Sequence, residues 1–315
     1  MLKRLLLLAV MVCLLPGCAH HAQQSVPVAS PVLCKSQQTR YMPAFNRVQV
    51  SGRLNVNLYT GSSRPYVVLR GDPRDLSQIS TKVGYNTLVL ASAGGFPKGE
   101  VLVEIHSRYL NDFNYQGGGT IKGQNIHSGL LDLKISNPGT TTLSGNIHLR
   151  RVELDGPGYT EIQGVSSTGL QLNLSGKARL KISGVANIAN LNLDGDGWFG
   201  MYWVKSNALT IRAKGHTVIQ LAGIANKLDV ELWGYARFNG RYLRAKTTFA
   251  KTHNHSVAEI TTLKRQHTLA TDASDIYFYK IPETKANFMA YNGSVLDMRG
   301  WNPDVVVEDY TRYNK

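Results

Sequence analysis

The chain has 315 residues, of which 43% are hydrophobic and 18% are charged, and this balance excludes an intrinsically disordered protein. Lysine and arginine outnumber aspartate and glutamate by 35 to 21, so the formal net charge at pH 7 is +14. The 30 glycines and 15 tyrosines favour short strands joined by tight turns over a helical fold.

The start of the chain has the pattern of an export signal. A basic segment, Met1-Leu-Lys-Arg4, precedes an apolar run from Leu5 to Leu15. This run is too short to span a bilayer about 30 Å thick as a helix. It therefore predicts a signal peptide and not a membrane anchor.

The next segment, Leu15-Pro16-Gly17-Cys18, resembles a lipobox, in which a small residue precedes a cysteine whose thiol receives a diacylglycerol. The alternative is an ordinary signal peptide with a cysteine at its end by chance. We expect residues 1–17 to be a lipoprotein signal peptide and Cys18 to be the lipid attachment site. Ala19 stands where inner-membrane retention would favour Asp, which is similar to Gram-negative lipoproteins of the outer membrane. We therefore expect an outer-membrane location, on the periplasmic face or at the cell surface.

Processing changes the charge and the cysteine content. Removal of Lys3 and Arg4 lowers the formal charge from +14 to +12. Such a chain can associate with anionic head groups, lipopolysaccharide or acidic polysaccharide, whereas export argues against nucleic acid as a partner. The basic residues form no dense run, so dispersed solvated charge is the alternative. Cys13 leaves with the signal and Cys18 takes the lipid, so Cys34 has no internal disulfide partner, and pairing between chains stays open.

Residues 18–40 are polar, contain Pro27 and Pro31, and show no sustained period. This composition predicts a flexible lipidated tether.

Residues 41–109 predict the N-terminal β-rich part of a solenoid. Apolar and polar residues alternate in Arg47–Leu58 and in Glu100–Ile105, so each strand has one buried and one wet face. Between these strands, Asp72-Pro73 predicts a turn or one helical turn, since Pro suits the position after an Asp cap.

Residues 110–300 repeat with spacings of 18–21 residues. Glycine-bearing turns come after most of the repeated strands. One coil cannot bury its own apolar face, whereas stacked coils make a continuous core. We therefore predict an all-β parallel β-helix, or β-solenoid, with residues 301–315 as a C-terminal tail. The recurring apolar position holds Phe113, Leu133, Leu154, Leu174, Leu193, Ile211, Val230, Phe249, Leu269 and Met289.

Two other architectures have features in common with this pattern. A leucine-rich horseshoe has a similar period, but its Leu-x-x-Leu-x-Leu-x-x-Asn motif is absent. A Greek-key sandwich would not explain why the same position keeps its character in successive units.

Phe45–Leu58, Leu110–Ile121 and the Leu-x-Leu-x-x-Ser-Gly coils resemble the GIN domain, a family associated with autotransporter adhesin heads. The likeness covers residues 45–300. His106–Tyr109 departs from the family pattern, in which we expect a Pro, and the coils after Phe249 have fewer turn glycines. The resemblance implies a β-helical fold and a surface role, and it carries no catalytic residues.

Signatures of catalysis and metal binding are scarce. The chain has no Gly-x-Ser-x-Gly elbow and no phosphate-binding loop. Asp194-Gly-Asp196-Gly is typical of turns, and a calcium loop would need a ligand where Trp198 stands. His253 and His255 offer two metal ligands without a third nearby in sequence. We therefore expect no catalytic residues, no metal site and no cofactor.

A carboxylate pair is the exception that we weigh. Asp132 and Glu153 occupy equivalent positions of neighbouring predicted coils, which would place them roughly 5 Å apart, near the spacing in a retaining glycosidase. A solvent-facing ladder of polar residues explains the same column without catalysis.

Large aromatic or basic side chains recur five residues after the repeated apolar position. In register they would form a strip roughly 20 Å long. Aromatic faces with interleaved cations suit sugar rings and acidic groups, so this strip is the candidate ligand site. The alternative is that these side chains cover apolar edges at a coil corner. The strip consists of Tyr159, Arg179, Trp198, His216 and Tyr235.

The leading hypothesis is a lipid-anchored envelope binding or adhesion module without catalytic activity, which recognises glycans or acidic envelope polymers. One alternative is a polysaccharide-active enzyme that uses Asp132 and Glu153. Another is an envelope scaffold that docks a protein partner. The sequence leaves the ligand, the protein partner, the oligomeric state and the number of strands in each coil open.

Overall fold

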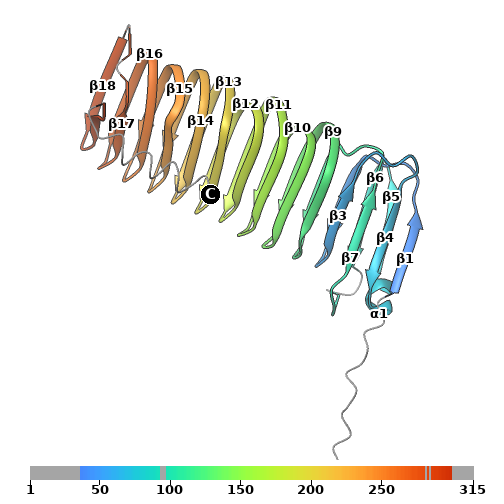
Figure 1. Ribbon diagram of the computed structural model, residues 1–315. Coiled ribbons are helices and arrows are strands. Elements are labelled where there is room, and N and C mark those ends of the chain that lie inside the picture. The colour runs from blue at the N-terminus through green and yellow to red at the C-terminus, as the bar shows by residue number, and fades with distance from the viewer. Residues whose placement is uncertain (1–35, 93–96, 281, 284, 300–315) are drawn as a thin grey trace, which may run out of the picture. The chain divides into compact units, whose positions relative to one another are not determined.

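A computed structural model describes residues 36–92, 97–280, 282–283 and 285–299. Of the described residues, 74% lie in strands and 2% in a helix, and together they form a β-solenoid of about nine turns (Figure 1). This confirms the predicted fold. The predicted signal peptide, Cys18, Cys34 and the tail 301–315 lie outside the described residues.

The regular part of the solenoid consists of long strands, each of which makes most of one coil. Each strand pairs in parallel with the next, so equivalent positions lie above one another. The strands are β9 (Ile121–Ser136), β10 (Thr140–Asp155), β11 (Tyr159–Gly176), β12 (Arg179–Gly195), β13 (Trp198–Gly215), β14 (Val218–Leu232), β15 (Arg237–Thr252) and β16 (Val257–Thr271).

Each coil has three short sides. In β10 the pairing with β11 shifts register after Ser144 and again after His148, which divides the strand at two corners. We call the resulting segments side 1, side 2 and side 3 in chain order. Each side points two residues inward and the alternate ones outward. The inward pairs of β10 are Thr141 with Leu143, Ile147 with Leu149, and Val152 with Leu154.

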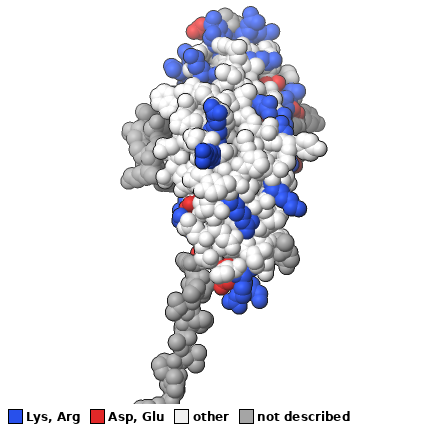
Figure 2. All heavy atoms as spheres, turned by 90° about the vertical axis from the view of Figure 1, so that its right-hand side faces the viewer, with Lys and Arg blue, Asp and Glu red and all other residues white. Residues whose placement is uncertain are grey.

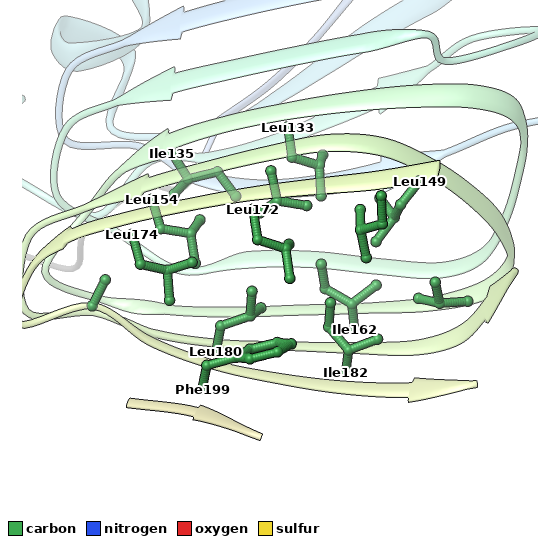
Figure 3. Close-up of a cluster of buried hydrophobic side chains, with 14 of the residues drawn as sticks. Leu133, Ile135, Leu149, Leu154, Ile162, Leu172, Leu174, Leu180, Ile182 and Phe199 are labelled. Atoms are coloured by element: carbon green, nitrogen blue, oxygen red, sulfur yellow. The ribbon is translucent and has the colours of Figure 1, made fainter. Parts of the chain in front are cut away.

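The three sides enclose one continuous apolar core. Figure 3 shows Leu172 and Leu174 of side 3 directed across the interior toward Ile162 and Leu180 of side 1. These side chains are at most 4% exposed. Full burial of each such side chain contributes about 1.5–3 kcal/mol, so every added coil extends and stabilises the core.

Successive coils are 19 or 20 residues long at Leu180, Phe199, Ile219 and Phe238, within the predicted range. The prediction of which apolar residues are equivalent in successive coils was partly wrong. Leu133 lies beside Val152, whereas the predicted Leu154 lies beside Ile135. Side 3 carries apolar residues two positions apart, so alternation alone does not show which of them is equivalent in the next coil.

The first corner of several coils needs glycine for two reasons. At Gly164 the backbone has a φ of +74°, and a Cβ would overlap the carbonyl oxygen of Gly145 in the coil beneath. Gly184 and Gly223 have φ of +136° and meet the preceding coil in the same way. The conformation and the close approach of two backbones therefore both exclude a side chain.

The turns between coils also contain residues with a positive φ, and toward the C-terminus fewer of these residues are glycine. Gly215 and Gly234 have φ of +84° and +76°. The His255 amide donates to Gly234, so Asn254 occupies the equivalent place in the next turn, with a φ of +59°. Asparagine tolerates the left-handed region better than most residues do, which explains how the later coils turn without glycine.

The N-terminal region builds its coils out of chain order. The coil of β2 (Arg47–Ser51) and β3 (Asn55–Tyr59) lies between two coils that the chain forms later. On one side β2 and β3 pair with β6 (Thr87–Ser92) and β7 (Leu102–His106). On the other side they pair with β8 (Asp112–Gln116) and the start of β9.

Antiparallel strands cover this end of the solenoid (Figure 1). The β4 strand (Tyr66–Gly71) pairs with β7, and β5 (Ile79–Gly84) pairs with β6. Residues 36–40, predicted as tether, belong instead to β1 (Ser36–Tyr41), which pairs antiparallel with β4.

The predicted helical turn is α1 (Pro73–Ser77), capped by the Asp72 carboxylate, which accepts from the Arg74 amide. No helix in the described ranges is long and apolar enough to cross a bilayer.

The C-terminal end consists of shorter strands. They are β17 (Asp275–Phe278), β18 (Lys285–Tyr291) and β19 (Ser294–Asp297).

We expect Gly164→Ala to lower the free energy of unfolding by roughly 2–4 kcal/mol, because the strained φ and the overlap with Gly145 act together. Urea unfolding measures the loss. Gly169→Ala in the same strand is the matched control, since no atom lies within 4 Å of the added Cβ. It should change stability by less than about 0.5 kcal/mol. Equal losses in the two variants would contradict the corner argument.

Candidate functional site

The predicted strip is divided between two columns. Tyr159, Arg179 and Trp198 lie in register at the start of side 1. Trp198 then pairs with Val218, so His216 does not continue this column. His216 and Tyr235 lie instead on the turn that precedes side 1. The prediction of one strip was wrong because Leu193 pairs with Ala213 and not with Ile211, a difference of two residues.

The side 1 column is partly packed onto the solenoid. The Trp198 indole lies over Gly200, where a Cβ would meet the ring at 2.5 Å. Beside it, Lys181 Nζ lies 3.4 Å from Glu161 Oε1. Burial, followed by the negative charge of Glu161, raises the pKa of the Tyr159 phenol, so this group stays a neutral hydrogen-bond donor.

The turn column forms a ladder of stacked rings. The centroids of His216 and Tyr235 are 4.8 Å apart with an interplanar angle of 5°, and Tyr235 and His255 are 5.2 Å apart. A second row runs alongside, in which Trp233 and His253 are 5.7 Å apart. We call these five residues the ring ladder.

Stacking decides which part of each ring faces outward. Tyr235 has a ring on both of its faces, so the ladder offers ring edges to solvent and not the open faces that we expected for sugar binding. These edges carry the tyrosine hydroxyl and imidazole nitrogens, which donate and accept hydrogen bonds. Lys214 Nζ lies 5.4 Å from the Trp233 centroid, and Asp196 Oδ1 lies 3.4 Å from His216 Nδ1, so the ladder also has a charge of each sign beside it.

A groove of about 850 Å³ crosses side 3 of the coils from β8 to β13. Its floor is formed by two rows of outward polar residues that lie in register. The first row contains Asn114, Lys134, Glu153, Asn173, Asn192 and Arg212. The second row lies two residues further along each strand and includes Asp155, Asp194 and Lys214.

Polar contacts order the groove. Asn192 Nδ2 donates to Asn173 Oδ1 at 2.9 Å, and Lys134 Nζ lies 3.5 Å from Glu153 Oε2. At the β13 end of the groove, Arg212 Nε lies 3.2 Å from Glu231 Oε2.

The charges in the groove balance. Lys134, Arg212 and Lys214 bring three positive charges. Three carboxylates line the same groove, those of Glu153, Asp155 and Asp194. The lining therefore matches a neutral, hydroxyl-rich ligand better than a polyanion.

The two carboxylates weighed as a catalytic pair are not equivalent. Asp132 pairs in register with Arg151, and Glu153 pairs with Lys134. Arg150 Nε donates to Asp132 Oδ1 at 2.8 Å, so each carboxylate faces a cation. The expected spacing was wrong for the same reason as the strip, a two-residue error in the register of side 3.

The two histidines weighed as metal ligands belong to different rows of the ring ladder. His253 Nδ1 lies 2.8 Å from Thr271 Oγ1, and His255 stacks on Tyr235. Asp194 and Asp196 flank Gly195, a turn glycine with a φ of +115°. Within the part of the chain that the structure describes, no three His, Cys, Asp or Glu side chains are grouped to hold a metal ion.

A family model described as "Putative auto-transporter adhesin, head GIN domain" matches residues 44–202 and 165–282. The chain belongs to the GIN domain family. The match confirms the resemblance drawn from the sequence, and it extends over the coils that carry the groove and the ring ladder.

Several solved structures are similar to this GIN domain at low sequence identity. A "putative adhesin" from Parabacteroides distasonis is 14% identical, with a TM-score of 0.47, covering 84% of this chain and 96% of that one. A "putative adhesin" from Parabacteroides merdae is 13% identical with a TM-score of 0.46, covering 84% and 95%. A "putative lipid binding protein" from Parabacteroides distasonis is 11% identical with a TM-score of 0.44, covering 84% and 96%. No curated protein matches the chain.

Sequence reasoning missed the groove of this GIN domain, although its signal was present. Asn173 and Asn192 stand 19 residues apart, one coil length, as do Asn207 and Asn226. Polar residues at the coil period mark an outward row just as apolar ones mark the core.

A further ring stack near the N-terminal end of the GIN domain was also missed. His106 lies between Tyr59 and Tyr66, with centroids 4.5 and 4.1 Å away. Desolvation lowers the pKa of His106, and the nearby Glu104 opposes this only in part. The three rings come from three different strands, so no local sequence pattern indicates the stack.

We expect acid to destabilise the GIN domain through His106. Its pKa is lower in the folded than in the unfolded chain, so its contribution is complete above about pH 6.5 and is lost as the pH falls, when the unfolded chain takes up the proton first. Melting temperatures measured from about pH 7.5 to about pH 5.5 should fall less in His106→Gln than in the wild type. A parallel fall in both proteins would exclude this role.

Proposed function

We propose that this chain is a non-catalytic binding module of the cell envelope that recognises a glycan along the groove of side 3. The observation that carries the proposal is a polar, charge-balanced groove with side chains that repeat at the coil spacing. Membership of a family described as adhesin heads supports a surface role. The groove volume lies within the range of ligand sites.

The spacing of the lining suits a chain of sugar residues. Equivalent side chains on neighbouring coils are about 4.8 Å apart, so an extended polymer lying along the axis meets an amide or charged group at each coil. The Asn173 and Asn192 amides each keep donor and acceptor capacity beyond the bond they share.

The predicted ligand residues take a secondary place in this proposal. None of Tyr159, Arg179, Trp198, His216 and Tyr235 lines the groove. His216 and Tyr235 lie on the turn just beyond the Asp194 and Lys214 end of the groove, where the ladder edges offer hydrogen bonds to a ligand that extends over the turn.

Catalysis receives no support from the carboxylates on the described sides. Asp132 and Glu153 each face a cation and are not neighbours in register. A glycosidase pair needs two carboxylates that face each other across the scissile bond, and these two do not.

The envelope location is proposed from the N-terminal sequence. A lipid on Cys18 would hold the mature chain at the outer membrane, and residues 19–35 would separate the lipid from β1. Acidic envelope polymers remain a second ligand class, favoured by the net positive charge of the chain.

We expect Asn173→Ala with Asn192→Ala to weaken glycan binding at least about tenfold, because each loss removes hydrogen bonds from the groove floor. A glycan array followed by calorimetry with the best-bound oligosaccharide measures the change.

The matched control is Asn207→Ala with Asn226→Ala. This pair is also hydrogen-bonded between neighbouring coils, at 2.6 Å, but lies on side 2. It should leave glycan binding unchanged. Trp198→Ala with Tyr235→Ala belongs in the same assay, where a small loss is expected. A larger loss there than in the groove variant would move the site to the predicted residues.

Lipidation is tested separately. Labelled palmitate should enter the wild-type protein in cells and should not enter Cys18→Ser, because the thiol is the acceptor. When the cells are fractionated, less of the variant than of the wild type should be recovered with the outer membrane. Labelling of Cys18→Ser equal to that of the wild type would exclude the proposed anchor.

A further inference from the structure

Side 2 of the coils β12 to β16 carries charge of one sign. Its segments are 185–189, 203–208, 223–227, 242–247 and 261–265, and they hold no aspartate or glutamate. All the basic residues in these segments are exposed. They are Lys205, Lys227, Arg244, Lys246, Lys264 and Arg265.

Apolar side chains are exposed on the same surface. Trp203 is 72% exposed, and Val185, Ile224 and Tyr242 are 53%, 46% and 42% exposed. They occupy outward positions that alternate with buried residues such as Val204, so the fold directs them to solvent. A tryptophan exposed to this degree has no role in the core, which points to a function in binding.

The coil register interleaves the two kinds of side chain. Lys205 pairs with Ile224, and Ile224 pairs with Arg244, so an apolar side chain lies between two cations on neighbouring coils. In the adjoining row, Ala222 pairs with Tyr242. The mixture therefore extends over several coils and is not confined to one edge.

A shallow hollow of about 350 Å³ opens on this side. Lys205, Ile224 and the amides of Asn187, Asn207 and Asn226 line it. The Asn226 amide donates to Asn207 Oδ1 at 2.6 Å, and the Asn207 backbone amide donates to Asn187 Oδ1 at 3.3 Å. A cation beside ordered amides suits an anionic head group.

The other surfaces are of a different kind. The groove of side 3 carries equal numbers of positive and negative side chains. Figure 2 shows the end of the solenoid where β1 and β5 lie, where both signs of charge occur; Arg74, for example, is paired with Asp72. Side 2 of β12–β16 combines one sign of charge with exposed aromatic and aliphatic groups over five neighbouring coils.

This combination fits one kind of partner. Tryptophan and tyrosine favour the boundary between head groups and acyl chains, and lysine and arginine are attracted to anionic lipid. The outward residues of one side come from a single parallel sheet and form a broad surface, which matches a bilayer better than a narrow polymer. We propose that side 2 of β12–β16 docks on an anionic lipid surface, with Trp203 inserted at the boundary and the six basic side chains over the head groups.

The test uses the compact unit 34–315 without the lipid anchor. Every buried core residue in the part of the chain that the structure describes lies within this unit. It should sediment with vesicles that contain about 30% phosphatidylglycerol and not with pure phosphatidylcholine vesicles, and added salt should release it. Lys205→Glu with Arg244→Glu and Lys246→Glu should lower binding at least about 30-fold. Circular dichroism confirms that each variant keeps its β-structure.

The control makes the same charge change elsewhere. Lys122→Glu with Lys177→Glu and Lys251→Glu alters exposed residues of side 1, a turn and side 3. It should lower binding to the same vesicles less than about threefold. Equal losses in the two triple variants would mean that only net charge matters and would overturn the docking surface.

Trp203→Phe separates lipid from other anions. Fluorescence of the wild type should shift to shorter wavelength and be quenched by brominated lipid, and both changes should be mostly lost in this variant. Dextran sulfate serves as a soluble polyanion. If it binds as tightly as the vesicles and Trp203→Phe alters neither interaction, the surface recognises polyanions and the lipid proposal fails.

Discussion

The parallel backbone pairing between coils is the constraint on which the rest of the structure depends. Because each strand hydrogen-bonds to the next in register, every residue lies above its equivalent about 4.8 Å away. An inward position must therefore be compatible with burial in every coil. A corner must admit the carbonyl beneath it, as at Gly164, and an outward position becomes part of a row. The core, the glycines and the surfaces all derive from the same repeat.

This constraint explains what the sequence could predict. The predictions of the period, the solenoid and the family all depend on properties shared by many coils, so an error at one coil does not change them. The columns depend on the register of single residues. Leu154 and Val152 are equally good inward residues, and choosing the wrong one placed Glu153 beside Asp132 when it pairs with Lys134. A second error of the same kind, between Ile211 and Ala213, joined two separate columns into one predicted strip. Backbone pairing, which the pattern of apolar residues does not encode, decides between them.

Other surfaces were missed because their members are ordinary residues individually. Lys205 and Arg244 are far apart in sequence and separated by apolar Ile224. Only the fold collects them on one side. The three sides consequently differ in chemistry while sharing one core: side 3 carries a balanced polar groove, and side 2 of β12–β16 carries cations with exposed apolar groups. A β-solenoid can in this way present separate surfaces to separate partners without any change of architecture.

The placement of β2 and β3 has a consequence for how the chain folds. Their coil is the first to be synthesised, yet the strands on both sides of it come later, from Thr87 onward. During synthesis this segment has no template on either flank and must wait for two further stretches of chain to close around it. Assembly at this end therefore cannot proceed as stepwise addition of coils, whereas the coils from β9 to β16 can add one after another. The earliest strands of the solenoid are thus fixed in place only by strands that leave the ribosome after them.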